Sequence, residues 1–117
     1  PVRQIKMLVI ESDHGILLEK RPPRGIWGGL WSFPELATEA QVKTYAETLG
    51  IRILTSASLP TLRHTFSHYH LDIEPLHLQI TNATSLKGQD SNLIWFNTEN
   101  PETLGLSGVV TKILESR

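Results

Sequence analysis

A helix with a marked beginning and end, expected over residues 38–50, most constrains how this chain can fold. Thr38 and Gln41 have the spacing of a capping box, in which two residues bind each other's backbone at the start of a helix. Gly50 suits the position just beyond the last turn. Between these ends, apolar residues recur at i, i+3, i+4 and i+7 and form one apolar face. They are Val42, Tyr45, Ala46 and Leu49.

Strand-like segments lie on both sides of this helix. Residues 5–11 and 16–22 are largely apolar and flank the turn sequence SDHG, which predicts a hairpin. The segment 22–35 is dense in Pro, Gly and aromatic residues, so we expect a shaped loop there rather than a periodic element. Further strands are expected at 51–54, 69–73, 76–80 and 93–96.

The second half of the chain contains one irregular point and a final helix. Pro75 interrupts the alternating pattern of 69–80, and proline cannot donate to a strand ladder, so we expect an edge strand or a bulge there. The polar segment 82–92 predicts a loop. Residues 107–117 predict a closing helix with Ser107 as its N-cap.

The order of these elements is strand, strand, loop, helix, strands, helix. This order predicts an α+β fold with α/β layers, in which a mixed β-sheet has helices packed against it. A length of 117 residues fits one domain with one core. The sequence opens on Pro1 and not on methionine, so we expect a fragment of a longer protein.

Composition excludes several classes of protein. The chain has no cysteine, which excludes disulfide scaffolds, zinc knuckles and cysteine-held iron–sulfur clusters within it. Its formal net charge is −1 and its pI is near 6.6. A domain that held DNA alone would be more basic, so we expect any DNA binding to need help. No apolar run approaches the roughly 18 residues of a membrane span.

Residues 29–51 resemble the box of the Nudix family. That box consists of Gly, five residues, Glu, seven residues, Arg-Glu, an aliphatic residue, any residue, Glu-Glu, any residue, Gly and a second aliphatic residue. The 23-residue frame is intact here and implies a Nudix-like fold. The matching positions are Gly29, Glu35, Glu47, Gly50 and Ile51.

The departures from the box bear on its chemistry. In the Nudix family the box glutamates hold Mg²⁺ and help to cleave a pyrophosphate. Two of those positions, at i and i+4 on one helix face, are Thr44 and Thr48 here. The box arginine is Lys43, which lacks the bidentate fork of a guanidinium. Since Mg²⁺ wants carboxylate oxygens, we interpret the chain as a Nudix-like scaffold without the metal site. By itself, Glu47 is more simply a solvated helix residue.

Two longer stretches resemble the C-terminal domain of MutY-type adenine DNA glycosylases. They are KRPPRGIWGGLWSFPE at 20–35 and LRHTFSHYHLDI at 62–73. The end of the chain, with IWFN at 94–97 and LGLSGVVTKIL at 104–114, is similar to the closing segment of the same domain. The resemblance spans nearly the whole chain.

This resemblance implies a function in base excision repair of DNA. The whole enzyme of that family is a hydrolase, a glycosidase that removes adenine mispaired with 8-oxoguanine. Its N-terminal domain carries a [4Fe–4S] cluster and cuts the glycosidic bond, while the C-terminal Nudix-like domain recognises 8-oxoguanine on the opposite strand. Residues 1–117 would then be that single recognition domain, without cofactor or activity alone. Its partners would be 8-oxoguanine:adenine duplex and the N-terminal domain, in the bacterial cytoplasm at the nucleoid.

The stretch HTFSHYH at 64–70 permits three interpretations. As a metal site it is disfavoured, because the spacing of His64 and His68 suits a helix whereas that of His68 and His70 suits a strand. As a catalytic dyad it is also disfavoured, because Ser67 and His68 are adjacent and would point to opposite faces of a strand.

The third interpretation is a ligand-recognition loop. Oxidation at C8 turns N7 of guanine into a donor and adds an O8 acceptor, and a hydroxyl such as that of Ser67 can bind either one. Phe66 would wedge or stack beside the base. The resemblance assigns this role to Phe66, Ser67 and His68, with His68 positioning the loop or approaching a phosphate. The structural alternatives are a core phenylalanine, a turn hydroxyl and a satisfied surface histidine.

Other candidate residues have structural explanations of equal weight. Aromatic residues amid glycines usually pin a loop to the core, and we expect this of Trp27 and Trp31. The candidate phosphate contacts can equally be solvated surface cations. They are Lys20, Arg21, Arg24 and Arg63.

Two other functions compete with lesion recognition. An active Nudix hydrolase of nucleoside diphosphate derivatives would use Glu35 and Glu47, and is weakened by Thr44 and Thr48. A protein-interaction module would have no effect on DNA at all.

Overall fold

The structure is a computed structural model and describes residues 1–25, 27–81, 92–98 and 105–116. The expected loop at 82–92 lies almost entirely outside the described residues. No helix in the described ranges is long and apolar enough to cross a membrane. The elements are β1 (Val2–Ser12), β2 (Gly15–Lys20), β3 (Trp31–Ser32), β4 (Glu35–Leu36), α1 (Glu39–Leu49), β5 (Arg52–Ser58), β6 (Leu62–Thr65), β7 (His70–Thr81), β8 (Leu93–Phe96) and α2 (Gly108–Ser116).

The strands form one mixed sheet, as the sequence predicts. Its order is β3-β2-β1-β7-β5, with β4 pairing β1, β6 pairing β7 and β8 pairing β2. The two long strands β1 and β7 are parallel neighbours, in register from Val2 opposite His70 to Glu11 opposite Gln79. The other pairs between strands are antiparallel. The expected hairpin of β1 and β2 is therefore confirmed.

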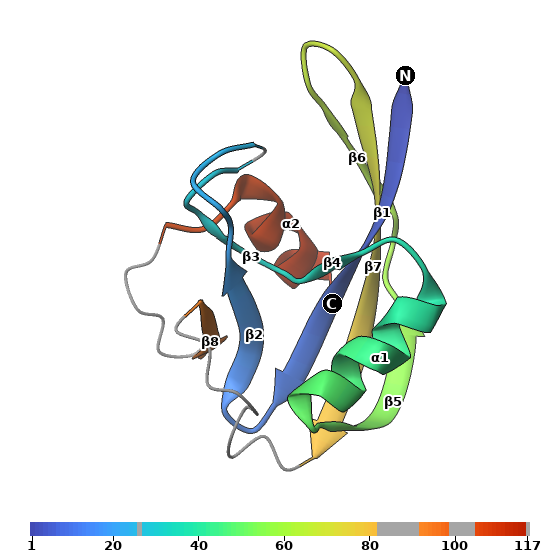
Figure 1. Ribbon diagram of the computed structural model, residues 1–117, viewed down its shortest axis with the longest axis vertical. Helices are drawn as coiled ribbons and strands as arrows, with labels where there is room; N and C mark the ends of the chain where they lie inside the picture. Colours follow the sequence, from blue (N-terminus) through green and yellow to red (C-terminus); the bar gives the residue numbers. More distant parts are fainter. Residues whose placement is uncertain (26, 82–91, 99–104, 117) are drawn as a thin grey trace.

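A helix covers each face of the sheet (Figure 1). Alternate residues of β1 serve the two faces, since successive strand residues point to opposite sides. Met7 and Val9 pack in the cluster that contains the buried residues of α2, and Leu8 and Ile10 pack in the cluster that contains those of α1. The result is a three-layer α/β/α sandwich with two cores, where the length of the chain suggested one.

The expected edge strand or bulge at Pro75 is wrong. Pro75 lies inside β7, which has β1 on one side and β5 and β6 on the other. Its carbonyl oxygen accepts the Leu59 N–H at 3.0 Å, so its ring nitrogen faces the same side. That side is the gap between Ser58, where β5 ends, and Leu62, where β6 begins. A missing donor there breaks no ladder bond.

Both helices begin and end close to the expected positions. Gln41 Oε1 accepts the backbone N–H groups of Ala37 and Thr38 at 2.8 and 3.3 Å, and Gly50 is left-handed with φ 71°. Ser107 precedes α2, and its hydroxyl donates to Ser32 Oγ at 3.1 Å; both serines are fully buried. It is thus a core hydrogen-bonding residue at the expected N-cap position.

Residues 21–25 and 27–30, the glycine-rich loop, project from the end of β2 as a shaped turn. Gly29 N–H donates to the Pro22 oxygen and Leu30 N–H to the Trp27 oxygen, both at 3.0 Å. A Cβ on Gly28 would lie 2.6 Å from the Pro23 oxygen, so this close approach requires glycine.

Candidate nucleic-acid interface

The HTFSHYH stretch forms the tip of a hairpin between β6 and β7. The β6–β7 hairpin closes where Thr65 faces His70, and Phe66 N–H donates to the Tyr69 oxygen at 2.9 Å. Ser67 and the residue after it, His68, lie at the turn with exposed side chains. Figure 1 shows this hairpin standing beyond the rest of the sheet, beside the N-terminal end of β1. The tip therefore projects from the body of the molecule and is exposed to solvent.

An aromatic cluster supports the hairpin from one face. The Phe66 ring lies 4.5 Å from the His64 ring, 4.9 Å from the Tyr69 ring and 5.9 Å from the Trp27 ring, centroid to centroid. Phe66, Tyr69 and Trp27 also pack against the core on the α2 side. Trp31 packs there too, so the expectation that both tryptophans pin the loop to the core is confirmed.

The histidines do not gather around one point. His64 faces Leu71 across the hairpin and shares its face, whereas His70 faces Thr65 on the other side of the sheet. Nδ1 of His70 lies 3.0 Å from the Thr65 hydroxyl. Across the ranges that the structure describes, no three His, Cys, Asp or Glu side chains could hold a metal ion.

Two of the predicted phosphate contacts are already in ion pairs. Arg21 pairs with Glu35. Arg63 pairs with Asp72 through Nε and Nη2, at 2.7 and 3.0 Å. These hydrogen bonds lower the pKa of the Asp72 carboxyl and raise the pKa of the Arg63 guanidinium, with charge attraction adding to both effects. Arg21 and Arg63 are therefore less available to a phosphate than the sequence suggested.

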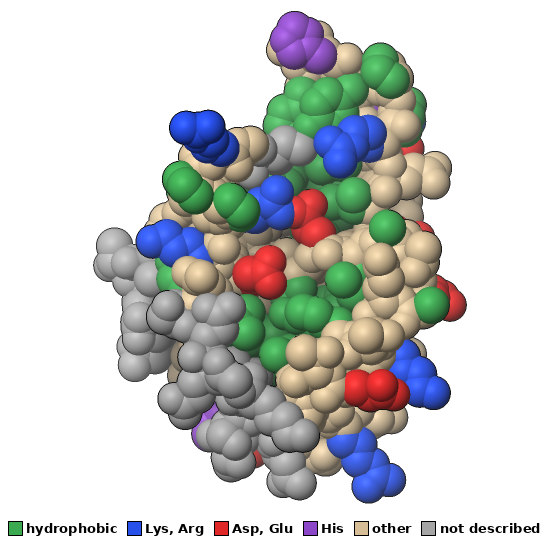
Figure 2. All heavy atoms as spheres, in the orientation of Figure 1, with side chains coloured by type: hydrophobic (Ala, Val, Ile, Leu, Met, Phe, Trp, Pro, Cys, Tyr) green, Lys and Arg blue, Asp and Glu red, His purple; other side chains and the backbone are tan. Residues whose placement is uncertain are grey.

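Two cations near the hairpin end remain accessible. Arg24 is exposed on the glycine-rich loop and has no ion pair among the residues described. Arg3 is exposed and lies over the Tyr69 ring at 5.6 Å. Arg3 was not among the predicted contacts, because the parallel pairing that brings β1 beside the hairpin has no local signal in the sequence. Figure 2 shows Lys and Arg side chains at this end of the molecule, with a His side chain at its tip.

The Nudix-box residues do not form a magnesium cradle. The hydroxyls of Thr44 and Thr48 donate to carbonyl oxygens one turn back, at 3.3 and 2.9 Å. Glu35 is paired with Arg21, and Glu47 is exposed on α1. Neutral hydroxyls bonded to their own helix do not fit an ion that wants carboxylates. The box residues of this chain therefore lack the ligands for metal-assisted cleavage of a pyrophosphate.

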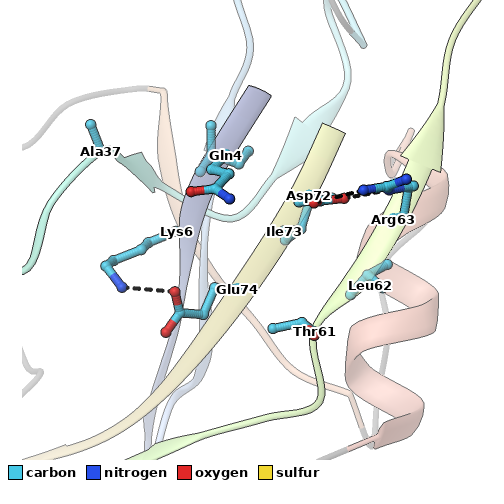
Figure 3. A pocket seen from close by; sticks show the side chains of 10 residues that line it. Gln4, Lys6, Ala37, Thr61, Leu62, Arg63, Asp72, Ile73 and Glu74 are labelled. Carbon is cyan, nitrogen blue, oxygen red and sulfur yellow. Dashed lines mark hydrogen bonds and ion pairs between the residues drawn. The ribbon is translucent and has the colours of Figure 1, made fainter. Parts of the chain in front are cut away.

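A pocket of about 470 Å³ lies on the open part of the sheet beyond α1 (Figure 3). Its charged groups neutralise one another within two pairs, Lys6 with Glu74 at 2.9 Å and Arg63 with Asp72. The pocket was not predictable from the sequence, since its lining comes from strands paired across the chain. Among the lining residues that the structure describes, every charged side chain belongs to one of these two pairs.

The family of the chain is clear from comparison with known proteins. A family model described as NUDIX domain matches residues 6–116, which is nearly the whole chain. The chain therefore belongs to the NUDIX domain family, and the predicted Nudix-like fold is confirmed.

Within this family, the chain is similar to curated proteins named adenine DNA glycosylase. The chain is 31% identical over 114 residues to the adenine DNA glycosylase of Buchnera aphidicola subsp. Baizongia pistaciae, covering 97% of this chain and 32% of that protein. It is 28% identical over 109 residues to the enzyme of the same name from Buchnera aphidicola subsp. Acyrthosiphon pisum, covering 93% and 31%. The chain thus spans about a third of the length of these relatives. The predicted resemblance to adenine DNA glycosylases is confirmed.

Solved structures agree on the fold. The C-terminal domain of mouse MUTYH, solved in complex with human PCNA, matches with a TM-score of 0.75 at 18% identity, over 97% of this chain and 85% of that chain. A MutT NUDIX hydrolase from Burkholderia pseudomallei matches with a TM-score of 0.74 at 20% identity, over 99% and 98%. The same fold therefore occurs in the C-terminal domain of mouse MUTYH and in a MutT NUDIX hydrolase.

Proposed function

We propose that residues 1–117 are the lesion-recognition domain of an adenine DNA glycosylase, acting in base excision repair. The domain binds duplex DNA at an 8-oxoguanine:adenine pair and recognises the 8-oxoguanine. A separate N-terminal domain of the longer chain, holding the [4Fe–4S] cluster, removes the adenine. The segment itself is catalytically silent, and the whole protein works in the bacterial cytoplasm.

The observation that carries this proposal is the exposed Ser67 at the tip of the projecting β6–β7 hairpin. In 8-oxoguanine, N7 carries a hydrogen and C8 carries an oxygen. A serine hydroxyl can accept from N7–H or donate to O8, whereas guanine has an N7 acceptor and a C8–H at these two positions. His68, beside Ser67, is exposed and can reach a neighbouring phosphate.

Phe66 has a supporting role in this proposal. Its ring packs against those of His64 and Tyr69, which holds the start of the turn in place. Its half-buried edge remains available beside a base at the lesion. We therefore assign recognition to Ser67, and shape and stacking to Phe66.

A hydrolase function has less support from the same residues. Thr44 and Thr48 occupy the positions of two metal-binding glutamates, and Glu35 is paired with Arg21. The similar fold of the Burkholderia pseudomallei hydrolase does not supply the missing carboxylates.

A pair of titrations tests the proposed function. Duplexes that differ in one base, 8-oxoguanine:adenine against guanine:adenine, are titrated with the chain alone and with the chain joined to its catalytic domain. The proposal predicts tighter binding of the 8-oxoguanine duplex, weak for the chain alone because its net charge is only −1. Equal affinity for both duplexes in both formats contradicts it, and turnover of nucleoside diphosphate derivatives with Mg²⁺ would favour the hydrolase.

A further inference from the structure

We propose that Trp27 is a positioning residue that orders the β6–β7 hairpin, so that the glycine-rich loop acts as its buttress. The value of this ordering for DNA rests on the proposed function, but the ordering itself can be measured without DNA. Trp27 belongs to the stretch whose Nudix-family counterpart precedes the metal-binding helix. In this chain the stretch would instead support the β6–β7 hairpin.

The contacts of Trp27 support this role. Its ring lies 5.5 Å from the His64 ring in an edge-to-face arrangement and 5.9 Å from the Phe66 ring. Both partners belong to the hairpin, at β6 and at the first residue of its turn. Such aromatic contacts are worth more than the area they bury, and they restrict both partners. Trp27 thus joins two segments that are far apart in the sequence.

The backbone at Trp27 indicates that its position is imposed by the loop. Trp27 has φ 52°, and it is the one non-glycine residue with positive φ in the described ranges. A bulky side chain seldom adopts this conformation, which persists where the surroundings hold it. The Leu30 N–H bond to the Trp27 oxygen at 3.0 Å and the close approach of Gly28 to Pro23 provide that restraint.

The base of the loop is fixed as well. Arg21 N–H donates to the Leu30 oxygen at 2.8 Å, and the Arg21 side chain pairs with Glu35 on β4. Trp31, which follows Leu30, donates its N–H to the Gly105 oxygen at 2.8 Å. Because the loop is bonded to the sheet at its base and restrained at its apex, its contact with the hairpin can restrict the motion of the hairpin. Glu35, the first glutamate of the Nudix box, thereby helps to hold the glycine-rich loop in place.

Local hydrogen exchange tests the proposal on the chain itself. The informative amide is that of Phe66, whose bond to the Tyr69 oxygen closes the turn. We expect Trp27→Ala to speed its exchange about tenfold while amides of β1 keep their protection, and Trp27→Phe to restore most of the protection. The matched control is Trp95→Ala, because Trp95 packs on the α1 side of the sheet. It should leave the Phe66 amide unchanged relative to β1.

The outcomes separate this proposal from the proposed function. Unchanged Phe66 exchange in a folded Trp27→Ala variant overturns the positioning role. If that variant does not fold, Trp27→Leu is used in its place and is judged by the same criterion. Faster exchange with loss of preference for 8-oxoguanine duplex supports both claims. Faster exchange in a chain that never preferred 8-oxoguanine supports the positioning role and contradicts the proposed function.

Discussion

The guanidinium of Arg21 forms an ion pair with the carboxylate of Glu35 across the base of the glycine-rich loop. Both side chains are about one-fifth exposed, so the pair is partly shielded from water. Glu35 aligns with the first glutamate of the Nudix box, and the box glutamates are the residues expected to bind a metal. In this chain the carboxylate of Glu35 is instead paired with the Arg21 side chain of the protein itself.

Magnesium should therefore not stabilise the chain. We expect about 10 mM Mg²⁺ to leave the Tm of the wild-type chain unchanged, because a ligand stabilises a fold only by binding it. The double substitution Thr44→Glu and Thr48→Glu places two carboxylates on one helix face, and Mg²⁺ should raise the stability of that variant by about 1 kcal/mol. Thermal unfolding with and without Mg²⁺ measures both. A Mg²⁺-dependent rise in the wild type would contradict the absence of a metal site.

Arg24 should contribute one phosphate contact. The logarithm of DNA affinity falls with the logarithm of salt concentration by about 0.9 per neutralised phosphate. Arg24→Gln should therefore reduce the salt slope by roughly 0.9 for all sequences alike, as fluorescence anisotropy at several salt concentrations can measure. Arg52→Gln is the control, because Arg52 is exposed on β5 at the opposite edge of the sheet. An unchanged slope for Arg24→Gln would remove this residue from the interface.

The Arg63–Asp72 pair should make the stability of the folded chain depend on pH. Hydrogen bonds from Arg63 lower the pKa of Asp72, so the folded state holds its proton less tightly than the unfolded state. The stabilisation by this pair is then fully present above the pKa of an aspartate in the unfolded chain, about 3.9. It is lost as the pH falls through the lower pKa of Asp72 in the folded state. The Tm difference between wild type and Asp72→Asn should be constant from about pH 7 to 5 and shrink below about pH 4.

Because about half of the Arg63 side chain and a third of the Asp72 side chain are exposed to water, this difference should be small and should shrink further in high salt. A difference that grows as the pH is lowered below about 4 would have the wrong sign for a carboxylate with a depressed pKa.

Local patterns predicted much of the fold. The ends of α1 were predictable because Gln41 and Gly50 act on backbone groups within a few residues. The strands β1, β2 and β8 were predictable from short apolar runs. The error at Pro75 has a physical cause that lies outside its own segment. Whether a proline fits a central strand depends on the neighbouring strand, and here β5 ends and β6 begins beside it.

The candidate site was predictable only in part, because several of its contacts join residues far apart in the sequence. The position of Ser67 in a loop was expected from the resemblance of residues 62–73 to the glycosylase domain, whereas the pairing of Arg63 with Asp72 required the register of β6 and β7. The contact of Trp27 with the hairpin joins residues far apart in the chain, and no spacing in the sequence encodes it. The position of Arg3 beside the hairpin also depends on a long-range contact, the parallel pairing of β1 with β7.

The measurement that tests the central claim most directly is the preference for 8-oxoguanine over guanine in the Ser67→Ala variant. The chain joined to its catalytic domain is titrated with the two duplexes, and Ser56→Ala, an exposed serine on β5, is the matched control. Loss of one base-edge contact should reduce the preference by about 1–3 kcal/mol in Ser67→Ala, while Ser56→Ala keeps the wild-type preference. Equal weakening of both duplexes by Ser67→Ala, or no change at all, would contradict the account.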